Sequence, residues 1–137
     1  MTTYLSLGTN LGNKELNLLK VIALIAERIG NLSAISSVYE TQACGFQSAN
    51  LFLNMALRVE TSLQPVELLK ASQEIERQMG RVKQHQYQDR IIDIDIILYD
   101  NIVYKSEELT IPHPLYRKRD FVMKPLQEII RNAMKTS

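Results

Sequence analysis

The hydrophobic positions of the chain repeat with two different periods, and each period predicts one type of element. Alternation of apolar and polar residues predicts a strand, because successive side chains of a strand point to opposite faces, whereas recurrence every three or four residues predicts a helix. Alternation predicts strands over residues 3–8, 32–41, 51–61 and 90–100, with a short edge strand at 101–103. Helical spacing predicts helices over residues 15–29, 65–79 and much of 120–133. Gly30 and Gly80 are predicted to end the first two helices.

The predicted elements follow one another in the order β-α-β-β-α-β, with additions at the C-terminus. This order is that of the ferredoxin-like fold, in which helices pack on an antiparallel sheet, and it predicts the α+β class. No linker or repeat interrupts the chain, so we expect one domain over residues 1–137. In the strand over 51–61, the predicted core face consists of Leu53, Met55, Leu57 and Val59. The opposite face then carries Phe52, Asn54, Ala56 and Arg58.

The strand predicted over residues 90–100 carries two aspartates within a run of isoleucines. Its apolar face is predicted to consist of Ile92, Ile94, Ile96 and Leu98. Asp93 and Asp95 share the opposite face, with α-carbons about 6.6–7 Å apart. One interpretation is a solvated polar face. The other is a site for a hard cation, because aspartate is a poor strand former and Mg²⁺ prefers carboxylate oxygens. Such a pair can bridge two magnesium ions about 3.5–4 Å apart.

Basic residues flank the two aspartates on both sides in sequence. Those that precede them are Arg81, Lys83 and Arg90, and those that follow are His113, Arg117, Lys118 and Arg119. Each is an ordinary solvated charge in the simpler interpretation. Together with a carboxylate pair, however, they are what a magnesium–polyphosphate complex requires. The chain has no P-loop or dinucleotide-binding fingerprint, so a nucleotide has to be held by side chains.

Composition excludes several classes of protein. The 137 residues are 45% hydrophobic and 23% charged, with a formal net charge of +1. This balance argues against nucleic-acid binding and against disorder. The single cysteine, Cys44, excludes an internal disulfide framework. The N-terminus does not resemble a signal peptide, and no apolar run approaches the roughly 18 residues of a membrane span. We therefore expect a cytoplasmic protein that binds neither nucleic acid nor membranes.

Several segments resemble those of one enzyme family, in that family's order and over nearly the whole chain. They read YLSLGTNLGN, SSVYET, FLNMALRVET, IERQMGR, RIIDIDIILYD, LTIPHP and RDFVMKPLQEI. The family is the 6-hydroxymethyl-7,8-dihydropterin pyrophosphokinases (HPPK) of folate biosynthesis. The resemblance implies a ferredoxin-like fold with three α/β/α layers. It also implies transfer of pyrophosphate from ATP to the hydroxymethyl group of the dihydropterin, with release of AMP and participation of two Mg²⁺ ions. ATP and the pterin are then the expected partners of a monomer.

The resemblance also implies roles for individual residues. The implied metal ligands are Asp93 and Asp95, with Arg81 and Arg90 as further catalytic residues. The implied ATP contacts are Gln73, Glu76, Lys83, Arg90, Ile96, Thr110, His113 and Arg119. The implied pterin contacts are Thr41, Ala43, Gly45, Phe52, Asn54, Tyr87, Asp93 and Phe121, with the two phenylalanines stacked on the two faces of the pterin. The chain departs from the family where Ala43 replaces a common proline, Tyr87 a tryptophan and Glu108 an arginine.

Two other functions remain open from the residues. A magnesium-dependent phosphohydrolase could use the same aspartate pair, but it would not need the set formed by Phe52, Asn54 and Phe121. A non-catalytic ferredoxin-like binding module would keep its function after replacement of Asp93 and Asp95 by alanine.

Overall fold

The residues that the structure describes fold around one five-stranded antiparallel sheet. The computed structural model describes residues 1–42, 50–81 and 89–136, with the backbone alone for 133–136. The strands of the sheet are β1 (Thr2–Thr9), β2 (Gly30–Ile35), β3 (Tyr39–Thr41), β4 (Phe52–Thr61) and β5 (Asp93–Tyr99). Their order is β2-β4-β1-β5, and β3 also pairs with β4. A small second sheet pairs β6 (Tyr104–Lys105) with β7 (Thr110–Ile111).

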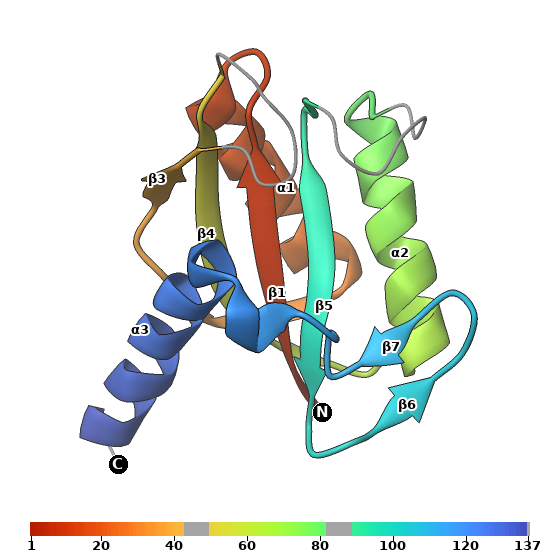
Figure 1. Cartoon of the computed structure of the whole chain (residues 1–137). Coiled ribbons are helices and arrows are strands. Elements are labelled where there is room, and N and C mark those ends of the chain that lie inside the picture. Colours follow the sequence, from red (N-terminus) through yellow and green to blue (C-terminus); the bar gives the residue numbers. More distant parts are fainter. Residues whose placement is uncertain (43–49, 82–88, 137) are drawn as a thin grey trace.

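Helices cover both faces of the five-stranded sheet. As Figure 1 shows, α1 (Lys14–Arg28) and α2 (Pro65–Gln78) lie on one face. The short 3₁₀ helix η1 (Tyr116–Lys118) leads into α3 (Asp120–Thr136), which crosses the other face. The βαββαβ order and the three layers confirm the predicted α+β, ferredoxin-like fold. None of the helices in the described ranges combines the length and apolar character that a bilayer span requires.

The hydrophobic core has two parts, one on each face of the sheet. The larger part lies under α1 and α2 and includes the predicted apolar face of β4, namely Leu53, Met55, Leu57 and Val59. The smaller part lies under α3 and centres on Ile97, Val122 and Leu126. Burial of each such side chain contributes about 1.5–3 kcal/mol to stability. The alternation of β4 therefore predicted its buried face correctly.

A bulge in β5 changes the face on which its last residues lie. Tyr4 of β1 pairs with Leu98, but Leu5 pairs with Ile96, so Ile97 is an extra residue. An extra residue reverses the alternation beyond it. Leu98 consequently packs beneath α3, and Tyr99 enters the larger core instead. The prediction that Leu98 shares a face with Ile96 is wrong, whereas the faces of the residues before the bulge are as predicted.

The strand predicted over residues 32–41 is split into β2 and β3 at Ser36. The backbone N–H of Ser36 donates to the carbonyl oxygen of Ala56 at 3.0 Å, but the N–H of Ala56 donates to Ser36 Oγ at 2.8 Å. A side-chain oxygen thus replaces a backbone carbonyl in the ladder and lets the chain turn between the two strands. Continuous alternation in the sequence concealed this interruption.

Two further boundaries differ from those predicted. Gly30 was predicted to end the first helix, but α1 ends at Arg28 with Ile29 as its C-cap. Gly30 is instead the first residue of β2, where an added Cβ would clash with the carbonyl oxygen of Glu60. The edge strand predicted at 101–103 is wrong, because Asp100 has a positive φ of 46° and begins a turn. The strand follows one residue later, as β6.

Replacing Ser36 by alanine tests the split between β2 and β3. Because the buried N–H of Ala56 loses its acceptor, we expect Ser36→Ala to lower the free energy of unfolding by about 1–3 kcal/mol. Urea unfolding followed by circular dichroism measures the change. The matched control is Ser62→Ala at an exposed position, which should stay within about 0.5 kcal/mol of the parent. Equal midpoints for Ser36→Ala and the control would contradict this account.

Candidate active site

The register of the sheet brings polar residues from three strands onto one face. In β1, Gly8 pairs with Asn54 of β4 on one side and with Asp93 of β5 on the other. Residues that pair directly across strands point to the same face. A Cβ on Gly8 would lie 3.4 Å from Asn54 Oδ1 and 3.7 Å from Phe52. Because glycine has no side chain, no atoms project from β1 between Phe52 and Asp93.

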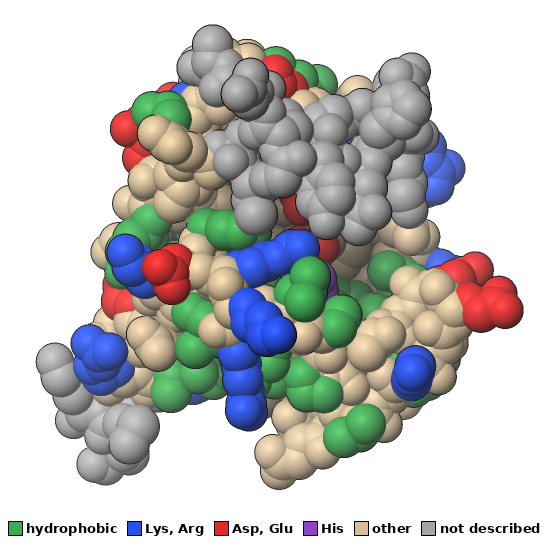
Figure 2. Space-filling view, viewed as in Figure 1, with side chains coloured by type: hydrophobic (Ala, Val, Ile, Leu, Met, Phe, Trp, Pro, Cys, Tyr) green, Lys and Arg blue, Asp and Glu red, His purple; other side chains and the backbone are tan. Residues whose placement is uncertain are grey.

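One row further along, small residues continue the same surface. Ser6 of β1 pairs with Ala56 of β4 and with Asp95 of β5. The two aspartates of β5 therefore project from the face that α3 crosses, as their spacing predicted. Figure 2 shows Lys and Arg side chains running down the middle of this face, with Asp or Glu side chains directly above them. Carboxylates and cationic side chains are thus concentrated together.

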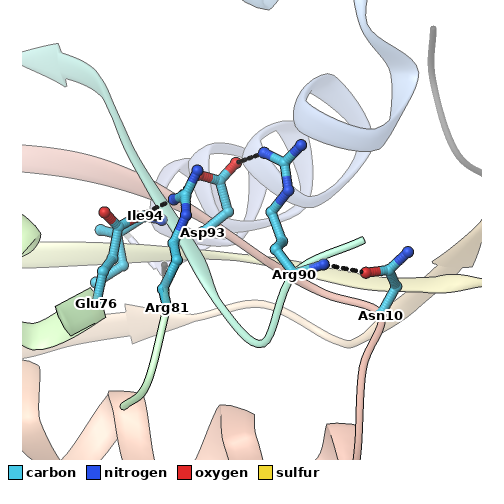
Figure 3. Close-up of polar contacts among 6 residues, drawn as sticks. All are labelled: Asn10, Glu76, Arg81, Arg90, Asp93 and Ile94. Atoms are coloured by element: carbon cyan, nitrogen blue, oxygen red, sulfur yellow. Dashed lines mark hydrogen bonds and ion pairs between the residues drawn. The ribbon is translucent and has the colours of Figure 1, made fainter. Parts of the chain in front are cut away.

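Asp93 is held between two arginines. Arg81 Nη1 donates to Asp93 Oδ1 at 2.7 Å and to Glu76 Oε2 at 2.6 Å, as the close-up in Figure 3 shows. Arg90 Nη1 lies 3.3 Å from Asp93 Oδ2. The backbone N–H of Ile94 donates to Glu76 Oε2 at 2.8 Å, which fixes the glutamate of α2 against β5. Arg81 and Arg90 therefore both contact the carboxylate of Asp93 on β5, and Arg81 also links this carboxylate to Glu76 of α2.

Two carboxylates of this site, those of Glu76 and Asp95, carry raised pKa values. Burial raises the pKa of Glu76 to about 7, although Arg81 and the N–H of Ile94 act in the opposite direction. Burial raises the pKa of Asp95 well above its usual range, and the carboxylates of Asp93 and Glu76 raise it further, against the opposing effect of Arg119. Within the described ranges, Asp95 forms no ion pair with a cationic side chain. The charged form of the Asp95 carboxyl is therefore unfavourable in this structure.

The donor set can be compared with what magnesium requires. Asp93 and Asp95 offer hard carboxylate oxygens from alternate positions of one strand. In the part of the chain that the structure describes, no group of three or more His, Cys, Asp or Glu side chains could hold a metal. Magnesium usually takes one or two carboxylates and completes its coordination with water and phosphate oxygens. The pair therefore fits magnesium that arrives with a nucleotide.

The two aromatic rings predicted to hold the pterin each lie beside an arginine. The guanidinium carbon of Arg90 is 5.9 Å from the ring centroid of Phe52, and that of Arg119 is 5.7 Å from the ring centroid of Phe121. These are cation–π distances. Residues predicted to contact ATP are thus in contact with residues predicted to contact the pterin, so the two expected binding regions adjoin.

Two more predicted residues are held by local hydrogen bonds. Asn54 is buried, and its Nδ2 donates to Thr41 Oγ1 of β3 at 2.6 Å. The N–H of Leu115 donates to His113 Nδ1 at 3.3 Å, so the neutral imidazole carries its proton on Nε2. Burial and Arg119 lower the pKa of His113, whereas Asp93 raises it. The neutral form is therefore favoured in this structure.

The remaining predicted residues differ in how the structure places them. Gln73 is exposed on α2, one turn before Glu76, and Thr110 lies half-buried in β7. The side chain of Ile96 is 4% exposed within the larger core, so only its backbone can meet a nucleotide. Arg117 is exposed, and its Nε donates to the hydroxyl oxygen of Tyr116. The predictions for Ala43, Gly45, Lys83 and Tyr87 lie outside the described residues.

One buried residue next to the site, Asn10, was not predicted from the sequence. Asn10 follows β1 and is 1% exposed, and its Oδ1 accepts from the backbone N–H of Arg90 at 2.7 Å. Asparagine between glycines is typical of a solvated turn, so its type and neighbours gave no signal of burial.

The titration of Glu76 gives a testable pH dependence. The folded chain holds the Glu76 proton up to about pH 7, whereas the unfolded chain releases it near pH 4.5. Between these values the folded state binds more protons, so this group's contribution to the free energy of unfolding falls as the pH rises and stays low above pH 7. Glu76→Gln keeps the neutral shape. We expect no difference at pH 4 and a stabilisation of up to about 3 kcal/mol at pH 8, without added metal.

Urea unfolding at the two pH values measures this effect. The matched control is Glu74→Gln, a glutamate of the same helix that is 54% exposed in an ion pair with Arg77. Exposed pairs of this kind contribute about 0–1 kcal/mol, so the control should depend little on pH. An equal response of both variants would contradict the burial of charge at Glu76.

Comparison with known proteins identifies the family. The sequence model of the 7,8-dihydro-6-hydroxymethylpterin-pyrophosphokinase (HPPK) family matches residues 4–131. The chain belongs to the HPPK family. An HPPK relative from Bacillus subtilis, a 2-amino-4-hydroxy-6-hydroxymethyldihydropteridine pyrophosphokinase, is 38% identical over 133 residues, which cover 96% of this chain and 80% of the relative. A relative of the same name from Aquifex aeolicus is 41% identical over 133 residues, which cover 97% of this chain and 82% of the relative.

A solved structure shows the HPPK fold independently. A crystal structure of an HPPK-DHPS in complex with substrates superimposes with a TM-score of 0.76 at 14% identity, over 94% of this chain and 40% of that chain. At this identity the likeness concerns the fold alone. The predicted HPPK membership, the fold and the pyrophosphokinase activity in folate biosynthesis are confirmed.

Proposed function

We propose that this HPPK chain transfers the pyrophosphoryl group of ATP to the hydroxymethyl group of 6-hydroxymethyl-7,8-dihydropterin, with two Mg²⁺ ions held by Asp93 and Asp95. The observation that carries the proposal is the arrangement on β5. Two carboxylates project from one face. Arg81 and Arg90 contact Asp93, Arg90 also lies over Phe52, and the charge of Arg119 acts on Asp95. Magnesium held by Asp93 and Asp95 would supply positive charge against the negative charge that develops on the phosphate oxygens.

Side chains around the aspartates orient the nucleotide. Arg81 donates to both Asp93 and Glu76 and thereby fixes the orientation of the Asp93 carboxylate. Arg90 and Arg119 supply cationic groups for the phosphate oxygens, since guanidinium matches their geometry. Neutral His113 can donate from Nε2 to the same region. No protein nucleophile is required, because the pterin hydroxyl attacks the β-phosphorus and AMP leaves; the protein contributes positioning and charge stabilisation.

The pterin side consists of two rings and an amide. Phe52 and Phe121 provide aromatic faces for the bicyclic ring, and such stacking contributes about 0.5–1.5 kcal/mol beyond burial. Asn54 provides an amide for hydrogen bonds to the pterin edge, and Thr41 fixes that amide. A phosphohydrolase would gain nothing from this set, and the set therefore favours pyrophosphoryl transfer over hydrolysis.

Identification of the nucleotide product tests the proposed function. The chain is mixed with ATP, MgCl₂ and 6-hydroxymethyl-7,8-dihydropterin, and nucleotides are separated by chromatography. We expect AMP in equal amount to a pyrophosphorylated pterin, and negligible AMP without the pterin. Formation of ADP, or equal ATP consumption with and without the pterin, would contradict pyrophosphoryl transfer.

Pterin binding is expected to depend on the nucleotide. Arg90 and Arg119 lie against the rings of Phe52 and Phe121, and a bound triphosphate would draw both guanidinium groups toward its oxygens. We predict at least a tenfold higher pterin affinity when magnesium and an unreactive ATP analogue are present, about 1.4 kcal/mol of coupling. Isothermal titration calorimetry with and without the analogue measures it. Equal affinities would contradict the coupling.

We also propose that the chain acts as a monomer of one domain, residues 1–137, in the cytoplasm. The support is the modest size, the single cysteine and the small substrates expected. Light scattering on the purified chain tests the oligomeric state, and a dimer mass at micromolar concentration would contradict it. Cell fractionation tests the location.

A further inference from the structure

Asn10 forms a buried junction between segments that are distant in sequence. It is 1% exposed, and Oδ1 accepts from the backbone N–H of Arg90 at 2.7 Å. Its own backbone N–H donates to the carbonyl oxygen of Arg90 at 3.1 Å. Nδ2 donates to Asp89 Oδ1 at 2.7 Å and lies 3.5 Å from the carbonyl oxygen of Asn50. Every polar atom of this amide is therefore used.

The partners of Asn10 lead directly to both sides of the site. Arg90 reaches Asp93 with its guanidinium, 3.3 Å away, and lies over Phe52 at 5.9 Å. Asn50 stands two residues before Phe52, and its Nδ2 donates to Asp89 Oδ2 at 3.2 Å. Asp89 is thus shared between the two asparagines. The backbone of Arg90 is fixed at both its N–H and its carbonyl oxygen by one residue.

We propose that Asn10 is a positioning residue for pyrophosphoryl transfer, which it supports by fixing the backbone of Arg90 relative to Asp93 and Phe52. The inference rests on the proposed function. Only two residues separate Arg90 from Asp93, so a small rotation of the Arg90 backbone displaces the guanidinium from both Asp93 and Phe52. Displacement of a positioned group by about 1 Å can reduce a rate about 100-fold.

The direction of the hydrogen bonds suggests a sharp experiment. Asn10→Asp keeps the acceptor for the N–H of Arg90 but turns the donor toward Asp89 into a second carboxylate. In the double variant with Asp89→Asn, the new amide N–H at position 89 donates to the new carboxylate at position 10, so the hydrogen bond is restored in the opposite direction. The amide oxygen at position 89 still accepts from Asn50. The net charge of the double variant equals that of the parent. The matched control, Asn13→Asp, adds the same charge three residues away at the exposed N-cap of α1, where aspartate is an equally good cap.

Steady-state kinetics and thermal unfolding are measured for all variants, with AMP as the product. We expect Asn10→Asp to lower kcat/KM about 10- to 100-fold at a temperature where circular dichroism shows it folded, and the double variant to recover most of this loss. Asn13→Asp should retain the parent's kcat/KM. If Asn10→Asp retains the parent's kcat/KM, the proposal is wrong. Recovery of the melting temperature in the double variant without recovery of kcat/KM would assign Asn10 a structural role alone.

A milder comparison serves if Asn10→Asp does not fold. The single variant Asp89→Asn is then compared with the double variant, and adding Asn10→Asp to Asp89→Asn must raise kcat/KM, whereas a fall contradicts the proposal. Failure of the proposed function is distinguishable, because in that case the parent chain itself would form no AMP from ATP and the pterin.

Discussion

Asp95→Asn is expected to lower kcat for AMP formation by at least about 1,000-fold while the chain remains folded. The asparagine keeps the shape of the side chain but removes a negative charge from the proposed magnesium site. A bound metal contributes several kcal/mol of charge stabilisation in the transition state, and about 4 kcal/mol corresponds to a thousandfold rate. Because the pKa of Asp95 is raised by burial and by Asp93 and Glu76, its charge is unfavourable in the metal-free chain. Stability should therefore be unchanged or increased.

Single-turnover AMP formation and magnesium titration by calorimetry measure the two consequences. The matched control is Asp100→Asn, in the turn directly after β5, where the carboxylate accepts from the N–H of Thr2 at 2.7 Å. An amide oxygen can accept that bond as well, so the control should keep normal turnover. Turnover near the parent's rate in Asp95→Asn would remove the basis for the metal assignment.

Arg81→Gln is expected to reduce both activity and stability, because Arg81 links two carboxylates. The guanidinium donates to Glu76 at 2.6 Å and to Asp93 at 2.7 Å, and the side chain is 15% exposed. Removing one partner of a largely buried pair leaves uncompensated charge and costs about 3–5 kcal/mol. Protonation of Glu76 limits this cost at low pH, since its pKa is about 7 even with Arg81 present. We expect the loss in stability to be largest at pH 8 and smaller at pH 5, and kcat/KM to fall about 100-fold.

Urea unfolding at both pH values and steady-state kinetics test this expectation. Glu76→Gln in the Arg81→Gln background should restore much of the stability at pH 8, but not the activity. The control is Arg77→Gln, in which an arginine that is 70% exposed loses an ion pair with Glu74 on the surface of α2. Such a pair contributes about 0–1 kcal/mol. A loss in Arg81→Gln no larger than that in Arg77→Gln would show that the bridge has little energetic importance.

The structure confirms the predictions from the sequence where a local period determines which face a residue occupies. The period of two in β4 and in the first part of β5 predicted which residues enter the larger core, and it placed Asp93 and Asp95 together on the other face. It failed at Ser36 and at Ile97, where one residue interrupts the ladder. A side-chain acceptor and a bulge leave the pattern of hydrophobicity nearly unchanged, so no local signal distinguishes them from continuous strands.

For the candidate site, too, the identities of residues were predictable from the sequence, whereas their contacts were not. The resemblance to the family supplied Glu76, Arg81 and Arg90 as separate residues, but their convergence on Asp93 depends on how α2 packs against β5. The predicted ATP contact of Ile96 is restricted to its backbone, because its side chain is buried in the core. Asn10 could not have been found, because its burial arises from segments 40 and 80 residues away.

By itself, the sequence determined the order of the elements, the buried faces of the strands and the pair of carboxylates, because side-chain alternation depends on neighbouring residues alone. The tertiary structure decided which cations meet those carboxylates, which aromatic rings lie beside them and which amide holds Arg90. These are contacts between strands, helices and loops that are far apart along the chain. Their distances and the raised pKa values arise only when the sheet forms and water is excluded from its surface.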